Sequence, residues 1–171
     1  MVRECGLTAY LLLREGIGVE ARLVRLKKRG PWTHIGLIVG GILFESVPST
    51  ERTQGGVRIG HVKDFCAPER AVQVGYIPIT LINPQCENLF HWCRRQVAQR
   101  VAFDDLYDLD NDQALYCSEF VYKAFQQIGV NLLTAELSCV SIPLVGTRKI
   151  IFPSDLVGLK SIFTNFSTLP L

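Results

Sequence analysis

One stretch of the chain decides the fold: Leu115-Tyr116-Cys117-Ser118-Glu119-Phe120-Val121-Tyr122-Lys123-Ala124-Phe125. It places a cysteine at the first turn of an expected amphipathic helix, which Gly129 can end. Counted from this cysteine, apolar residues recur at the spacing of one buried helix face, at Phe120, Val121, Ala124, Phe125 and Ile128. A thiol at a helix N-terminus lies at the positive end of the helix dipole, which favours the nucleophilic thiolate. The pattern indicates either a cysteine nucleophile or a small residue buried on the core face of the helix.

A histidine that could serve as the base opens a predicted hairpin. The run from His34 to Val39 and the run from Ile42 to Val47 flank Gly40-Gly41, which suits a tight primed turn. With the two glycines as the turn, Val39 pairs with Ile42, Ile38 with Leu43 and Leu37 with Phe44. His34 and Glu45 then share one face as diagonal neighbours, roughly 7–8 Å apart, with Gly36 leaving space between them.

A carboxylate that orients an imidazole, and an imidazole that reaches a thiol, form the arrangement used in nucleophilic catalysis. Other readings stay open: a strand-end histidine bonded to a backbone carbonyl, and a solvated Glu45. A shift of one residue in the pairing would separate His34 and Glu45 onto opposite faces. His61 is an alternative base that we consider weaker, and we expect His91 to be structural or exposed.

Several segments resemble one family in order along the chain, from about Gly16 to Leu156. They are the runs 32–39, 43–46, 55–58 and 61–65, the pair Tyr107-Asp108, the run 115–121 and the run 152–156. The chain resembles the permuted, YiiX-like group of NlpC-type papain-like cysteine hydrolases, which is related in arrangement to the lecithin:retinol acyltransferase family. The Tyr-Cys-Ser-Glu run that opens a helix is the most specific of the matching segments.

This resemblance implies an α+β, circularly permuted papain-like fold, with a central antiparallel sheet packed against helices and the nucleophile at a helix N-terminus. It implies Cys117 as the nucleophile, His34 as the general base and acid, and Glu45 as the residue that orients the histidine. Tyr116 is a weaker candidate for shaping the oxyanion environment, with ordinary packing as its alternative. We further expect substrate contacts from Trp32, Asp112 and Ser118.

Length and composition favour one globular domain over residues 1–171, with a core at about 7–157 and a C-terminal tail at 158–171. No run approaches the roughly 18 uncharged apolar residues of a membrane helix. A net charge of +2 is too small to indicate a nucleic-acid partner. The six cysteines show no zinc-ligand spacing, and the acidic loop 103–112 lacks the glycine and terminal glutamate of an EF-hand, so we expect no metal and no cofactor.

We expect a cytoplasmic protein, because the first residues lack an export signal and the cysteines are scattered. Members of the resembled group often carry such a signal, so an envelope substrate is in doubt, and delivery by a dedicated secretion system stays open.

The remaining segments predict further elements. We expect a helix over Val19–Leu26 whose basic side chains form either a solvated face or a contact for an anionic surface beside His34; these are Arg22, Arg25, Lys27, Lys28 and Arg29. Strands are expected at 57–59 and 71–77, a helix from Asn83 to Val101, and a cleft-edging loop at 48–56. Residues 132–143 are expected to be an apolar connector, and 150–156 a last strand followed by a turn.

These features predict a cysteine hydrolase that cleaves a peptide-like amide or an ester through an acyl-enzyme. Two alternatives use the same scaffold: an acyltransferase acting on a lipid-like substrate, and a catalytically inactive binding module. A purely structural protein is the least favoured class, because it leaves the Cys–His–Glu arrangement unexplained.

Overall fold

The computed structural model describes residues 7–17, 30–133, 136–142 and 144–157. Its centre is a five-stranded antiparallel sheet in the order β4-β3-β2-β1-β5. The strands are β1 (Leu7–Gly16), β2 (His34–Val39), β3 (Ile42–Val47), β4 (Gly56–Gly60) and β5 (Ala71–Leu81). The expected helix Val19–Leu26, the basic cluster 22–29 and the whole tail 158–171 lie outside the described residues.

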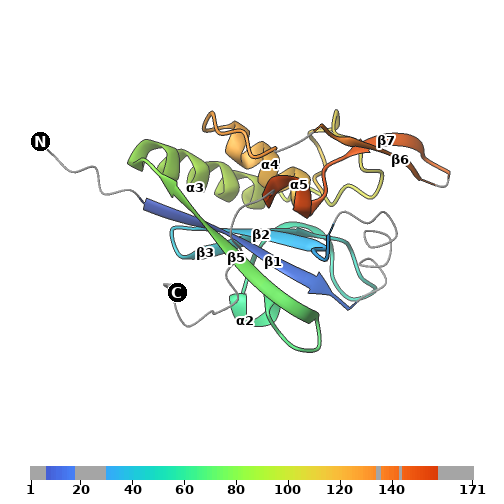
Figure 1. Ribbon diagram of the computed structural model, residues 1–171, viewed down its shortest axis with the longest axis horizontal. Coiled ribbons are helices and arrows are strands. Elements are labelled where there is room, and N and C mark those ends of the chain that lie inside the picture. Colours follow the sequence, from blue (N-terminus) through green and yellow to red (C-terminus); the bar gives the residue numbers. More distant parts are fainter. Residues whose placement is uncertain (1–6, 18–29, 134–135, 143, 158–171) are drawn as a thin grey trace, which may run out of the picture.

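Helices cover both faces of this sheet. Figure 1 shows α3 (Asn83–Ala98), α4 (Cys117–Gln126) and α5 (Pro153–Val157) on one side of the sheet and the short α2 (Val62–Phe65) on the other. A separate antiparallel hairpin, β6 (Ser138–Ile142) and β7 (Gly146–Ile150), lies beside α5. The architecture is therefore the mixed α+β fold with a central antiparallel sheet that the family resemblance implies.

The central hairpin has the predicted register. Val39 pairs with Ile42, Ile38 with Leu43 and Leu37 with Phe44. Gly40 and Gly41 have φ values of 59° and 74°, the left-handed region that a two-residue primed turn requires and that glycine adopts without a steric penalty.

Two apolar clusters pack the helices against the sheet, one on each face. There are two because neighbouring residues of a strand point to opposite faces. Leu11 and Leu37 belong to the cluster under α3 and α4, whereas Leu12 and Ile38 belong to the cluster that contains Phe65 of α2. This two-sided burial explains why β1 and β2 read as nearly continuous apolar runs.

Two sequence predictions near the C-terminus were wrong in part. The expected connector 132–143 contains β6, and the expected last strand ends at Ile150, after which Pro153–Val157 forms the helical turn α5. Proline suits the first position of a helix because its missing N–H needs no partner there.

Candidate active site

Cys117 is the first residue of α4, and the buried acid Glu119 caps the start of this helix. The Glu119 carboxylate, which is 0 % exposed, accepts the backbone N–H of Tyr116 at 3.3 Å. Lys123 lies 2.9 Å from the same carboxylate and 2.6 Å from Asp112. N–H groups in the first turn of a helix have no partner within the helix, so those next to the thiol can receive an oxyanion.

His34 and Glu45 meet across the central hairpin. The Nε2 atom of His34 lies 2.8 Å from Oε2 of Glu45, and both side chains are buried. The second carboxylate oxygen accepts Nε of Arg58 at 3.1 Å and its Nη2 at 2.8 Å. Both carboxylate oxygens of Glu45 are therefore hydrogen-bonded. Because Arg58 holds the carboxylate in place, the carboxylate in turn fixes the orientation of the His34 ring.

The space that this contact needs comes from a different glycine than we expected. A Cβ at Gly36 would lie 2.8 Å from Leu43 Cδ1 and 3.3 Å from the Phe65 ring, so Gly36 makes room for apolar packing. A Cβ at Gly60, on the neighbouring strand, would lie 2.8 Å from Oε1 of Glu45. Gly60 is therefore the residue that leaves room for the carboxylate.

The electrostatics of these three residues favour a thiolate beside an imidazolium. Burial alone raises the pKa of Cys117, but the hydrogen bond and charge of His34, with the N–H of Ile35, bring this pKa below its ordinary value. Burial likewise lowers the pKa of His34, and hydrogen bonds with Cys117 and Glu45 outweigh it, so that pKa is raised. Burial raises the pKa of Glu45, whereas His34 and Arg58 lower it to about 2.

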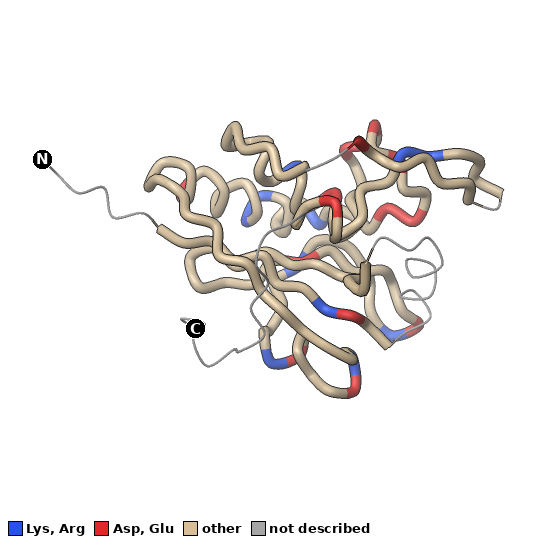
Figure 2. The backbone as a smooth tube through the Cα atoms, viewed as in Figure 1, with Lys and Arg blue, Asp and Glu red and all other residues tan. Residues whose placement is uncertain are grey.

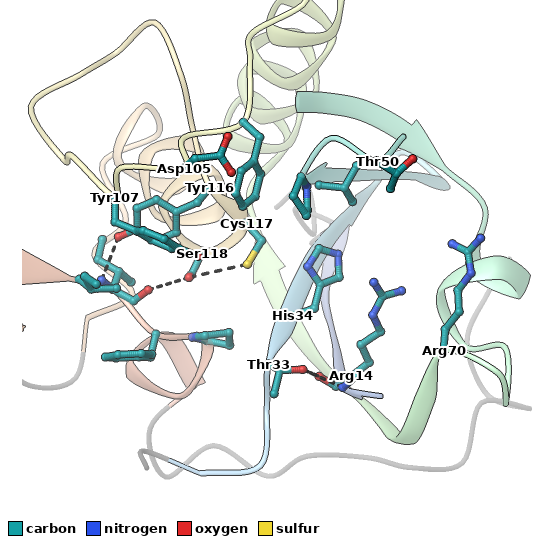
Figure 3. A pocket seen from close by; sticks show the side chains of 18 of the residues that line it. Arg14, Thr33, His34, Thr50, Arg70, Asp105, Tyr107, Tyr116, Cys117 and Ser118 are labelled. Atoms are coloured by element: carbon teal, nitrogen blue, oxygen red, sulfur yellow. Dashed lines mark hydrogen bonds between the residues drawn. The ribbon is translucent and has the colours of Figure 1, made fainter. Parts of the chain in front are cut away.

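The thiol opens into a cleft of about 760 Å³ (Figure 3). The loop after β3 lines it, as the sequence predicts, through Pro48, Thr50, Arg52 and Thr53. Apolar side chains from the C-terminal segment line another part of it: Val140, Ile142, Ile150, Ile151, Phe152 and Pro153. In Figure 3, Tyr107, Tyr116 and Ser118 lie on one side of Cys117, and His34, Arg14 and Arg70 lie on the other.

Tyr116 and Ser118 line this cleft, and both bond to Ile151; the Ser118 hydroxyl also lies 4.0 Å from the Cys117 sulfur (Figure 3). The Tyr116 hydroxyl accepts the N–H of Ile151 at 2.9 Å, and the Ser118 hydroxyl donates to the Ile151 carbonyl at 2.7 Å. The two residues that flank the thiol therefore clamp the C-terminal wall of the cleft.

Two of the expected substrate-contacting residues lie elsewhere. Trp32 is 7 % exposed and packs in the core, and Asp112 lies at the surface, where it pairs with Lys123; neither lines the cleft. His61 and His91 are exposed and are also absent from the cleft lining. Of the three histidines, the structure brings only His34 to the thiol.

Sequence reasoning missed three arginines at the site. Arg58 is the cross-strand partner of Glu45, and Arg14 is the partner of His34. The sequence predicted the strand that carries Arg58, at 57–59. It did not predict that this strand pairs with β3, which is what places Arg58 opposite Glu45. No sequence motif surrounds Arg14 or Arg70. Their position on the cleft depends on how the strands and loops are arranged in the fold.

Comparison with known proteins assigns the family. A model of the permuted papain-like amidases, the YaeF/YiiX or C92 family, matches residues 17–139. This chain belongs to that family. The fold agrees: YiiX from Escherichia coli O157:H7, 18 % identical, superposes with a TM-score of 0.69 over 93 % of this chain and 96 % of its own. No curated protein gives a match.

The solved YiiX structure is described as that of a metalloprotein. Within the described part of this permuted papain-like chain, no group of three or more His, Cys, Asp or Glu side chains could hold a metal ion, so these residues do not fit such a centre. Among the described helices, none has the length and apolar character needed to span a bilayer.

Proposed function

We propose that this chain is a cysteine hydrolase that cleaves an amide or ester bond through Cys117, His34 and Glu45. Family membership supports an amidase or peptidase, and one observation supports the residue assignment. The pKa of Cys117, at the start of α4, is lowered by His34, and the Nε2 atom of this imidazole is held at 2.8 Å by the buried carboxylate of Glu45.

In the proposed first step, the Cys117 thiolate attacks the carbonyl carbon and forms an S–C bond, while the carbonyl π electrons move to the oxygen. First-turn N–H groups of α4 would hold this oxyanion, an interaction worth roughly 3–4 kcal/mol per donor in comparable sites. When the intermediate collapses, the bond to the leaving group breaks, and that group takes the proton from His34.

The second step removes the acyl group. His34, now neutral, accepts a proton from water as the water attacks the thioester, and the S–C bond breaks to release a carboxylic acid and the thiolate. Glu45 keeps its charge throughout and stabilises the imidazolium, because its pKa of about 2 is far below that of the histidine.

The first test is the rate of alkylation of Cys117 by iodoacetamide as a function of pH, read by peptide mass spectrometry. At pH 6 an ordinary thiol is only about 0.3 % thiolate, so fast labelling there requires a lowered pKa. We expect Cys117 to be labelled at least tenfold faster than Cys139, an exposed thiol of the same chain. His34→Ala should abolish this difference, and Cys117→Ala should abolish turnover of any substrate.

Equal labelling of Cys117 and Cys139 at pH 6 would contradict the proposal and favour a binding module. Arg94→Gln on α3, away from the cleft, is the control that should leave the labelling unchanged.

The apolar wall of the cleft also favours a second candidate, an acyltransferase. Val140, Ile142 and Ile150 could hold an acyl chain while an amine or alcohol, instead of water, takes the acyl group. Adding an acceptor amine to a reaction that forms the acyl-enzyme separates the two: a transferase yields the transfer product, and a hydrolase yields the free acid.

A further inference from the structure

The cleft has two chemically different ends on either side of Cys117. Figure 2 shows that Lys and Arg are spread over the described backbone instead of gathering on one face. Four arginines line the cleft: Arg14, Arg52, Arg58 and Arg70. Arg58 is bonded to Glu45 and Arg52 lies in the loop after β3, whereas Arg14 and Arg70 lie on the His34 side of the thiol (Figure 3). Apolar residues of β6, β7 and α5 line another part of the wall.

Arg14 is held in place beside the histidine. It is the cross-strand partner of His34, and paired residues of neighbouring strands point to the same face. Its guanidinium lies 4.9 Å from the centre of the Phe65 ring, and Nη1 is 3.5 Å from the Phe65 carbonyl. These contacts aim the charge at the cleft without neutralising it.

Neither Arg14 nor Arg70 forms an ion pair with an acidic side chain in the described part of the chain. Glu45, whose charge acts on Arg14, is already bonded to His34 and Arg58. Glu69 and Asp105 also line the cleft but pair with neither arginine. Burial, the largest influence, lowers the pKa of Arg14; the charges of Glu45 and Cys117 raise this pKa, and those of Arg70 and Arg58 lower it. A half-buried cation that has a second cation beside it, and lacks an acidic partner, is stabilised when an anion binds.

The proposed reaction fixes which part of a substrate reaches these cations. The histidine gives its proton to the leaving group, so the leaving group lies on the His34 side, and the acyl group extends the other way, towards the apolar wall.

We infer that Arg14 and Arg70 form a subsite for a negatively charged oxyanion, a carboxylate or a phosphate, on the leaving group of a substrate whose acyl part is apolar. This inference rests on the proposed function for the direction of the substrate, and it makes the two arginines determinants of specificity. An amino acid joined through its nitrogen to an apolar acyl group, or the last residue of a peptide, has this chemistry.

The test is binding of three matched ligands to the full chain carrying Cys117→Ala, measured by calorimetry. The ligands are N-octanoyl-L-alanine, its phosphonate analogue and the neutral N-octanoyl-L-alaninamide. We expect one or both acids to bind at least tenfold more tightly than the amide, and the tighter of the two identifies the oxyanion. Arg14→Gln and Arg70→Gln, added separately and together, should reduce this preference to less than twofold, whereas Arg94→Gln should preserve it.

Equal binding of the acids and the amide, no binding of any ligand, or a preference that survives both arginine substitutions would overturn the inference. Arg70 is exposed, so Arg70→Gln removes no core packing and keeps the test valid if Arg14→Gln unfolds the chain. The iodoacetamide experiment is separate: fast labelling of Cys117 with equal ligand binding refutes the subsite alone, and slow labelling refutes the proposed function.

Discussion

At the scale of single residues, Glu45 connects His34, the proposed base, to Arg58 on the neighbouring strand β4. One carboxylate oxygen holds His34 and the other accepts two hydrogen bonds from Arg58, so the charged form has a partner on each side. Because burial alone would favour the neutral acid, the pKa of about 2 reflects these partners. The carboxylate should therefore be a measurable part of the stability of the chain.

We predict that this stability depends on pH in the acid range. A carboxyl whose pKa falls from 4.5 unfolded to about 2 folded stabilises the protein above pH 4.5, and this contribution is lost as the pH falls through 2. The full effect corresponds to about 3 kcal/mol. In urea unfolding between pH 6 and pH 2, the wild type should lose more free energy of unfolding than Glu45→Gln. Parallel curves for the two proteins would show that Glu45 is not stabilised in this way.

At the scale of elements, β4 leaves room for the Glu45 carboxylate, because Gly60 on this strand has no side chain. Gly60 faces Leu43 of β3, and an added methyl group would meet the Glu45 carboxylate at 2.8 Å. That carboxylate cannot move aside without loss of its bonds to His34 and Arg58.

We predict that Gly60→Ala slows alkylation of Cys117 at pH 6 several-fold, because the displaced carboxylate no longer holds the imidazole. Ile59→Ala, the neighbouring residue on the same strand and 44 % exposed, is the matched control and should label at the wild-type rate. Equal rates for Gly60→Ala and wild type would mean that Glu45 has more freedom than its contacts indicate.

Helix α4 depends on Glu119 at its start. Burial, the largest influence, raises the pKa of this carboxyl to about 7, although Lys123 and the N–H of Tyr116 lower it. We predict that Glu119→Ala costs about 2 kcal/mol of unfolding free energy, because it leaves the buried N–H of Tyr116 without an acceptor. Glu119→Gln keeps an acceptor and should cost clearly less. Urea unfolding measures both; equal losses would show that the charge of Glu119, and not its acceptor, matters.

At the scale of the whole molecule, contacts between segments that are distant in the sequence hold one wall of the cleft in place. Tyr116 and Ser118 hold Ile151, which lies 35 and 33 residues further along the chain. We predict that Tyr116→Phe speeds hydrogen exchange at the Ile151 amide at least tenfold, because that N–H loses its acceptor. The control is Tyr122→Phe, whose hydroxyl accepts only from Gln126 on the exposed side of α4 in the described hydrogen bonds. Unchanged exchange in Tyr116→Phe would indicate that packing alone holds this wall.

The sequence by itself determined those features that depend on neighbours along the chain. The 3.6-residue apolar period after Cys117 predicted α4, and Gly40-Gly41 predicted the hairpin with its register. That register placed His34 and Glu45 on one face, where the structure shows them in contact. Each of these follows from local geometry, because a helix face and a two-residue turn are specified by residues within a few positions of each other.

Only the tertiary structure decided the features that join separate segments. It placed Cys117 against His34, removed Trp32 and Asp112 from the cleft, and brought Arg14 and Arg70 to its edge. It also assigned the role of leaving room for Glu45 to Gly60 instead of Gly36. The physical reason is that strand order and helix docking are set by burial of two apolar clusters summed over the whole chain, and no short window of sequence specifies which strand becomes a neighbour.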